Sequence, residues 1–190
     1  MASNFAVVYD ACVLYPAPLR DLLMRLALTD LYRAKWTDQI HAEWTRNVIK
    51  NRPELEAAKL QRTCELMNAN VRDSLVVGYE AYIDSIELPD AGDRHVVAAA
   101  VHSRAEAIVT FNLKDFPKEA LSIFNIEAIH PDDFITDLWD LNAAKVLEAA
   151  RDHRLSLKNP PKDQDGYLET LLKQGLPNTV ALLSEIKIAF

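Results

Sequence analysis

The chain has 190 residues, of which 49% are apolar and 26% charged, as in an ordinary globular protein. This length suits one domain with an extension. The net charge of −7 excludes a protein that coats nucleic acid by bulk electrostatics, although carboxylates that hold a divalent cation could supply local positive charge. Cys12 and Cys64 are too few and too far apart for a disulfide framework, so we interpret them as small buried hydrophobes.

The chain shows no feature of a membrane or secreted protein. No window reaches the ~18 uninterrupted apolar residues that a membrane span needs. The short apolar run near the N-terminus has no preceding Lys or Arg and ends at Asp10, which argues against a secretory signal. We therefore expect a cytoplasmic protein without membrane contact.

Strands and helices alternate along the first 141 residues. Short apolar runs predict strands at 5–9, 32–36, 107–111 and 126–129, with a weaker candidate at 75–77. Helical periodicity and capping residues predict helices that begin near Pro18, after Thr37, near Leu55, at Asp93 and at Pro131. This alternation is typical of a three-layer α/β/α domain around a central parallel sheet.

The character of the sequence changes after residue 141. Helical segments are separated there by breaks at 159–162 and 175–177, both of which contain proline. Their apolar faces are too small to form a core of their own. We therefore predict a domain over 1–141 and a helical C-terminal extension over 142–190, which docks on the domain or on a partner.

Carboxylates occur where ligands bind in an open parallel sheet, beyond the carboxyl ends of the strands. Asp10 ends the first strand, and Asn112 and Asp115 follow the strand at 107–111. Asp93 opens the helix that leads into that strand, and Glu43 lies on the helix after Thr37. Oxygen donors without His or Cys suit Mg²⁺ or Mn²⁺, so these segments predict a metal site.

Each of these acids also has an ordinary structural interpretation. Asp90 and Asp93 stand three apart at a helix start, where the first can be an N-cap and the second can supplement it. Asp10 could be a turn residue, and Glu43 a solvated helix position. The combination favours a site, because several buried carboxylates without a cation would repel one another.

Three motifs in the right order carry a resemblance to a known family. Residues 8–15 (VYDACVLY), 88–100 (LPDAGDRHVVAAA) and 108–116 (IVTFNLKDF), together with Glu43, resemble the PIN-domain family, particularly its VapC-type toxin ribonucleases. The likeness covers roughly residues 5 to 135. It implies an endoribonuclease that hydrolyses single-stranded or looped RNA with Mg²⁺ or Mn²⁺, often as the toxin of a toxin–antitoxin pair. A small antitoxin is then the expected protein partner, and a homodimer stays open because relatives often dimerise.

The resemblance assigns Asp10, Glu43 and Asp93 to the acidic catalytic and metal-binding positions. At the fourth position many relatives carry an acid, whereas this chain has Asn112, with Asp115 three residues later. Either residue could complete the metal site, since an amide carbonyl can also serve a hard cation. We favour Asp115 as the catalytic residue and interpret Asp90 as a cap.

Other polar residues are candidates for supporting roles. Thr110 could hydrogen-bond a ligating carboxylate, although a β-branched strand residue needs no such role. Three cations, Arg20, Arg94 and Lys114, lie near the predicted rim and could contact RNA phosphates. We expect His41, His95 and His102 to pack or face solvent rather than act as bases.

Two other functions agree with parts of the pattern. A phosphatase or receiver domain also places an Asp after its first strand, but here Ala-Cys-Val follows Asp10 without a second nearby acid. A PIN-like scaffold that binds protein or RNA without cutting is suggested by Asn112 and the C-terminal helices. Metal binding distinguishes the scaffold from the nuclease.

Overall fold

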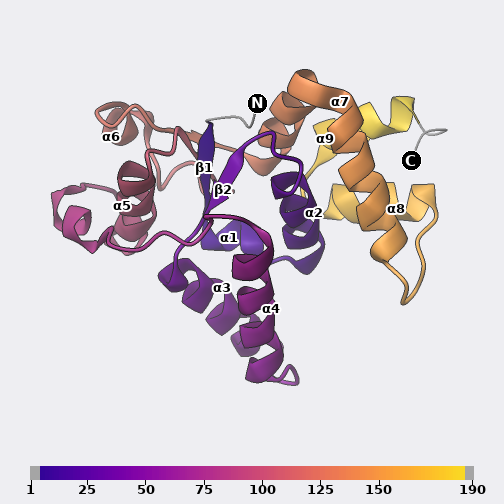
Figure 1. Ribbon diagram of the computed structural model, residues 1–190, viewed down its shortest axis with the longest axis horizontal. Coiled ribbons are helices and arrows are strands. Elements are labelled where there is room, and N and C mark those ends of the chain that lie inside the picture. The colour runs from indigo at the N-terminus through magenta and orange to yellow at the C-terminus, as the bar shows by residue number, and fades with distance from the viewer. Residues whose placement is uncertain (1–4, 187–190) are drawn as a thin grey trace.

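Four short parallel strands form the centre of the computed structural model, which describes residues 5–186 (Figure 1). Residues 1–4 and 187–190 lie outside that range. The first of these ranges begins the segment that we expect to lack a secretory signal, and the second ends the extension. The strands lie in the order β2-β1-β3-β4 and are β1 (Ala6–Tyr9), β2 (Arg33–Lys35), β3 (Ala107–Val109) and β4 (Glu127–Ile129). In the central strand, Val7 pairs with Ala34 on one side and Ala107 on the other. Every residue of β1 is buried, which explains its continuous apolar sequence.

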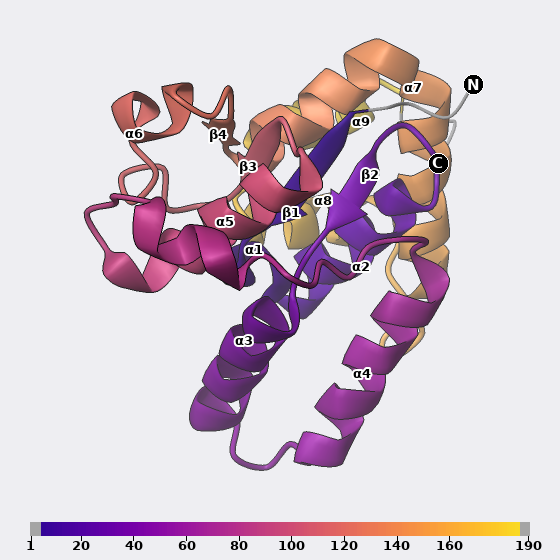
Figure 2. The same ribbon diagram turned by 60° about the vertical axis from the view of Figure 1, so that its left-hand side comes forward.

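Helices cover both faces of this sheet. In Figures 1 and 2, α5 lies on one side of the strands, and α2 and α7 lie on the other. The α5 helix has a run of small buried side chains, Ala98 to Ala100, that lets it pack closely against β1 and β3. The predicted α/β fold with a parallel sheet is therefore confirmed. The helices before the extension are α1 (Ala11–Leu14), α2 (Ala17–Ala27), α3 (Asp38–Asn51), α4 (Ala57–Asn70), α5 (Arg94–Ser103) and α6 (Lys118–Ser122), with 3-10 turns at Glu80–Ser85 and Ala91–Asp93.

The prediction of a strand at 75–77 is wrong. Leu75 forms a single bridge to Trp36, whose backbone bonds Ser74 and Val76 on either side. Gly78 then adopts a φ of 80°, a left-handed conformation that favours glycine and turns the chain away from the sheet. The pairing therefore ends before a strand can form.

The C-terminal part is helical and docks on the domain, as expected. It contains α7 (Pro131–Ser156), α8 (Gln164–Lys173) and α9 (Pro177–Glu185). Both α7 and α8 pack on α2, and α9 packs on α7 and α8. Within α7, Asn142 has non-helical angles (φ −162°, ψ 87°), so the helix bends there. The predicted boundary between 141 and 142 falls on this bend and stays a prediction.

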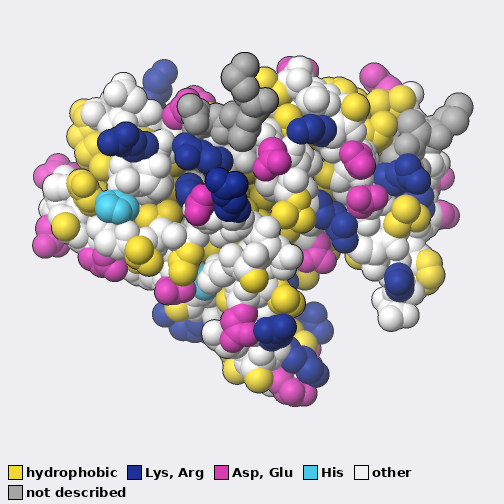
Figure 3. Space-filling view, viewed as in Figure 1, with side chains coloured by type: hydrophobic (Ala, Val, Ile, Leu, Met, Phe, Trp, Pro, Cys, Tyr) yellow, Lys and Arg dark blue, Asp and Glu magenta, His cyan; other side chains and the backbone are white. Residues whose placement is uncertain are grey.

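The surface mixes both signs of charge. On the face in Figure 3, acidic side chains are scattered, and Lys and Arg side chains gather near the middle. The acidic excess of the chain is therefore not collected on this face. None of the helices between residues 5 and 186 combines the length and apolarity needed to cross a membrane.

Candidate metal centre

Asp10, Glu43 and Asp93 line one pocket, with a volume of about 390 Å³. Asp10 follows β1, Glu43 comes from α3, and Asp93 directly precedes α5. Asn112, which follows β3, lines the same pocket. The fold thus gathers side chains from four segments beyond the carboxyl ends of β1 and β3, where ligands bind in open parallel sheets.

The Asp10 carboxylate is fixed by its neighbours. Its Oδ1 accepts a hydrogen bond from the Ala11 backbone N–H at 2.7 Å, so Asp10 caps the short helix α1. Its Oδ2 accepts from the Thr110 hydroxyl at 2.7 Å and from the Cys12 thiol at 3.0 Å. The role suggested for Thr110 as a hydrogen-bond donor to a carboxylate is therefore confirmed.

Glu43 is not a solvated helix position. Its side chain is 23% exposed, and its Oε1 lies 2.8 Å from Nε2 of His95, which is buried. His95 comes from α5, whereas Glu43 comes from α3. Contact between the two side chains therefore joins the two helices at the pocket.

Asp93 lies among other acids. Burial and the charges of Asp10, Asp90, Asp115 and Glu43, in that order, raise its pKa from 3.8 to about 6. The predicted cap is Asp90, whose carboxylate accepts from the Gly92 N–H at 2.7 Å. Asp93 stands at the N-cap position of α5, but its carboxylate makes no capping hydrogen bond there, so its interpretation as a supplement to the cap stays a prediction.

Both candidates for the fourth position lie close to the acids, but in different ways. Asn112 lines the pocket, and its side chain is exposed. Asp115 is half-buried and is not among the lining residues, although its charge contributes to the raised pKa of Asp93. The choice between Asn112 and Asp115 therefore stays open.

The donor set fits a hard divalent cation by its chemistry. Carboxylate and amide oxygens are the ligands that Mg²⁺ and Mn²⁺ prefer. Within residues 5–186, no group of three or more His, Cys, Asp or Glu side chains converges tightly enough to hold a metal as the side chains stand. Instead the acids line a shared space and repel one another. A divalent cation would relieve this repulsion, so binding would draw the carboxylates together.

Sequence reasoning missed several residues around the pocket. Cys12 is half-buried and contacts Asp10, so its interpretation as a buried hydrophobe is wrong. Burial and the Asp10 charge raise the pKa of the Cys12 thiol to about 12, so at neutral pH it is a donor rather than a thiolate. Tyr15, Asn47 and Asn51 also line the pocket. A spacing of four from Glu43 to Asn47 and again to Asn51 was the available signal.

Arg20 does not lie at the rim. It is buried, donates from Nη1 to the Leu14 carbonyl at 2.7 Å, and places its guanidinium 4.4 Å from the centroid of the Trp44 ring. The proposed phosphate contact for Arg20 is therefore wrong. The cation instead packs the start of α2 against α3.

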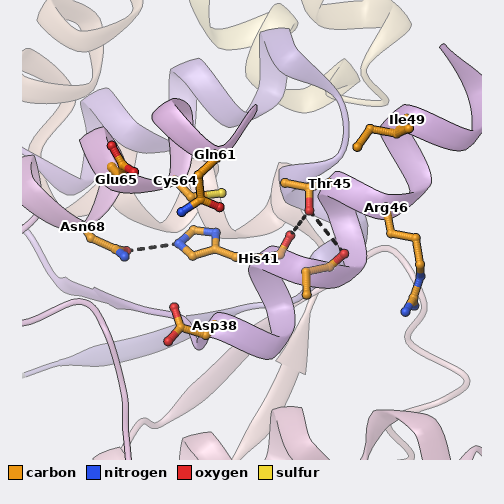
Figure 4. A pocket seen from close by; sticks show the side chains of 10 residues that line it. Asp38, His41, Thr45, Arg46, Ile49, Gln61, Cys64, Glu65 and Asn68 are labelled. Carbon is orange, nitrogen blue, oxygen red and sulfur yellow. Dashed lines mark hydrogen bonds between the residues drawn. The ribbon is translucent and has the colours of Figure 1, made fainter. Parts of the chain in front are cut away.

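A larger pocket of about 640 Å³ lies between α3 and α4, and Figure 4 shows its lining residues. Its histidine, His41, accepts from Trp44 Nε1 at Nδ1, and its Nε2 lies 3.0 Å from Oδ1 of Asn68. Burial lowers the pKa of His41 and raises that of the Cys64 thiol to about 11. His41 is held by Trp44 and Asn68, and the raised pKa keeps the Cys64 thiol protonated, so this pocket is not the better catalytic candidate.

Comparison with known proteins links the C-terminal part of the chain to VapC proteins. Residues 131–185 match the family model of the VapC50 C-terminal domain. A Mycobacterium tuberculosis protein named "Putative ribonuclease VapC50" is 63% identical over 49 residues. That match covers 26% of this chain and 29% of the relative, so the chain matches less than a third of that protein. No solved structure matches. The expected likeness to VapC proteins is confirmed by these matches, and the family match is confined to residues 131–185, which are similar to the VapC50 C-terminal domain.

Proposed function

We propose that this protein is an endoribonuclease that hydrolyses single-stranded or looped RNA with Mg²⁺ or Mn²⁺, as the toxin of a toxin–antitoxin pair. The observation that carries the proposal is the single pocket lined by Asp10, Glu43 and Asp93, which come from three segments far apart in the sequence. The name of the VapC50 relative supports ribonuclease activity.

The surroundings of Asp10 suit a ligand role. An ionised carboxylate offers about four acceptor positions, two on each oxygen. Both positions on Oδ2 are used by Thr110 and Cys12, whereas Oδ1 uses one for Ala11. Among residues 5–186, Asp10 therefore keeps a free acceptor position on Oδ1 while its side chain stays fixed.

Glu43 and Asp93 would complete the acidic set. His95 contacts Glu43 from α5, and the Asp93 carboxylate makes no capping hydrogen bond. When bound, the cation would neutralise a phosphate and activate a water for attack on phosphorus. At pH 7 Asp93 is mostly ionised, because its pKa of about 6 lies below that pH, and so it can serve as a ligand.

The test is metal uptake together with cleavage. We expect calorimetry to detect Mn²⁺ binding by the wild type, and EDTA to abolish hydrolysis of single-stranded RNA. Asp93→Asn should lose both, while Asp90→Asn, which changes an acid that does not line the pocket, should keep both. Cleavage that persists in EDTA would contradict the proposal, and absence of Mn²⁺ uptake would identify a scaffold that binds without cutting.

The fourth ligand position can be assigned by paired variants. We propose Asp115, because a charged carboxylate holds a divalent cation more strongly than a neutral amide. Asp115→Asn should then lower Mn²⁺ affinity about 10- to 100-fold, and Asn112→Ala should have less effect. If Asn112→Asp instead tightens Mn²⁺ binding while Asp115→Asn matches the wild type, Asn112 holds the position.

The toxin role needs a separate test. A small reading frame next to the gene should encode a protein that co-purifies with this chain. Expression of the chain alone should stop growth, and co-expression of the small protein should restore it. The Asp93→Asn variant is the control, because it should be harmless in both conditions.

A further inference from the structure

The pocket extends away from the carboxylates along one face of α3. Glu43, Asn47 and Asn51 are spaced four residues apart, so they share a helix face, and all three line the pocket. With a rise of 1.5 Å per residue, the two asparagines lie about 6 Å and 12 Å along the helix from Glu43. The charged end of the pocket is therefore followed by two neutral amides.

Tyr15 also lines the pocket, at its amide end. Its hydroxyl accepts a hydrogen bond from Asn51 Nδ2 at 3.0 Å, which ties the end of α1 to α3. The side chain is half-buried, and it also lines a second pocket of about 260 Å³ together with Pro16, Pro18 and Arg52. Tyr15 therefore lines two pockets, one of which contains the carboxylates.

The chemistry of this end differs from that of the carboxylate end. A phenol and two amides carry no charge at neutral pH. Aromatic rings are platforms on which unstacked RNA bases stack, and amides donate to and accept from base edges. An RNA strand with one phosphate at the carboxylates would place its next nucleotide near these groups.

We propose that Tyr15, Asn47 and Asn51 form a subsite for a nucleobase of single-stranded RNA next to the phosphate that is cut. Tyr15 supplies a stacking surface, and Asn47, which is exposed, reads a base edge. Asn51 holds the tyrosine in place through its hydroxyl. This inference rests on the proposed function, because it takes single-stranded RNA as the substrate. The subsite would give the site a preference among bases, which the acids alone cannot provide.

The test measures equilibrium binding of labelled oligouridine, oligoadenosine and oligocytidine. It also uses matched RNA strands that each lack one base, at a different position in each strand. Ca²⁺ replaces Mg²⁺, and strand integrity is checked after each titration. One of the three base types should bind most tightly. We expect the wild type to bind that strand about 5- to 100-fold more tightly than the matched strand that lacks the base at the subsite. Tyr15→Leu should abolish this difference, whereas Tyr15→Phe, which keeps the ring, should retain most of it.

Further variants separate recognition from structure. Asn47→Ala should change the ranking of the three base types, because an exposed amide contributes to choice rather than to folding. Two controls outside the pocket, Tyr82→Leu and Asn70→Ala, should behave as the wild type. The inference is overturned if folded Tyr15→Leu discriminates against the abasic strand as well as the wild type does, or if Asn47→Ala and Tyr15→Leu leave the base ranking unchanged.

Parallel measurements keep the two proposals distinguishable. Wild-type cleavage and Mn²⁺ uptake test the proposed function, whereas dependence of base discrimination on Tyr15 tests the subsite. Metal-dependent cleavage by a protein whose base discrimination does not depend on Tyr15 would disprove the subsite but not the nuclease proposal. Base discrimination that depends on Tyr15 in a protein without cleavage would remove the nuclease proposal and leave the subsite.

Discussion

The carboxylates of the candidate site are positioned by side chains outside the acidic set. Thr110 and Cys12 hold Asp10, and His95 contacts Glu43. Neither buried ring nitrogen of His95 makes a hydrogen bond among residues 5–186, and the 2.8 Å approach of Nε2 to Glu43 Oε1 is the polar contact of the ring. Such groups behind a ligand commonly determine how well the ligand is oriented.

Replacement of His95 should therefore weaken metal binding without removing a ligand. We expect His95→Leu to lower Mn²⁺ affinity about 10- to 100-fold, and His95→Gln, which retains an N–H donor, to lower it less. His102→Leu is the control, because His102 is exposed on the same helix. Calorimetry gives the affinities, and equal values for His95→Leu and the wild type would disprove the positioning role.

The raised pKa of Asp93 predicts how the stability of the metal-free protein depends on pH. The folded state binds the Asp93 proton more tightly than the unfolded chain does, because the pKa rises from 3.8 to about 6. The stabilisation is therefore present below pH 4 and is lost as the pH rises through 6. Asp93→Asn should be more stable than the wild type at pH 7 by about 1 kcal/mol, a value reduced for solvent screening of the half-exposed side chain.

Thermal melts in EDTA between pH 4 and pH 8 test this expectation. The difference in melting temperature between Asp93→Asn and the wild type should grow with pH and level off above pH 7. Asp90→Asn should show a smaller change, because the Asp90 side chain is exposed. A difference between Asp93→Asn and the wild type that does not vary with pH would contradict the assignment.

The sequence pointed to the acids that line the pocket and to Thr110, but not to the other partners. Asp10 and Asp93 could be singled out because a strand end and a helix start can be recognised locally, whereas Glu43 was singled out by the family resemblance. His95 and Arg20 were not, since the contact with Glu43 and the stacking on Trp44 depend on how α5 and α2 meet α3. Tertiary packing decides such contacts, and no local pattern encodes them.

At the scale of elements, a buried carboxylate connects two helices of the C-terminal part. Asp132, in the first turn of α7, accepts hydrogen bonds from the backbone N–H groups of Asn178 and Thr179 and from the Thr179 hydroxyl, at 2.7 to 2.9 Å. Asp132 therefore caps the start of α9 from another helix. The negative charge also suits the positive end of the α9 dipole.

Asp132→Ala should detach this end of α9. We expect the free energy of unfolding to fall by about 2 kcal/mol, because three donors lose a charged acceptor. The neighbouring Asp133→Ala is the control, since Asp133 is exposed and should change stability by less than about 0.5 kcal/mol. Urea denaturation measures both, and hydrogen exchange should show faster opening of α9 in Asp132→Ala alone.

The elements themselves were largely predictable, and the exceptions have physical causes. The strands at the centre were recognisable because burial on both faces requires continuous apolar residues. The segment at 75–77 has the same appearance but ends in the left-handed Gly78. The sequence also gave no sign of α1, since its few residues depend on the cap supplied by Asp10.

At the scale of the whole molecule, the extension covers the α2 side of the sheet. Both α7 and α8 pack on α2, and the Lys145 side chain donates to the Thr29 carbonyl near the end of that helix. His153 and Tyr167, which join α7 to α8 through a 3.0 Å hydrogen bond, are buried in this region. The apolar surfaces of α2 and of the extension thus depend on each other.

Deletion of residues 142–190 should therefore expose apolar surface and cause aggregation or loss of partner binding. The candidate site should keep most of its Mn²⁺ affinity, because its residues lie outside the deleted segment. Light scattering and calorimetry on the full chain and the truncated chain give the two results. A truncated protein that stays monodisperse and binds its partner normally would show that the extension has another role.

The contact between Asp10 and Thr110 spans 100 positions of the sequence, and it has a consequence for the order of events during synthesis. A growing chain that ends at Ser103 already contains Asp10, Glu43 and Asp93, but not β3, against which β1 pairs. Until the ribosome has released residues beyond Thr110, Asp10 lacks the donor that orients it, and β1 lacks the pairing with β3 that positions the site. Translation of the first half of the message therefore yields no assembled site, and the candidate metal site forms only after most of the domain has emerged.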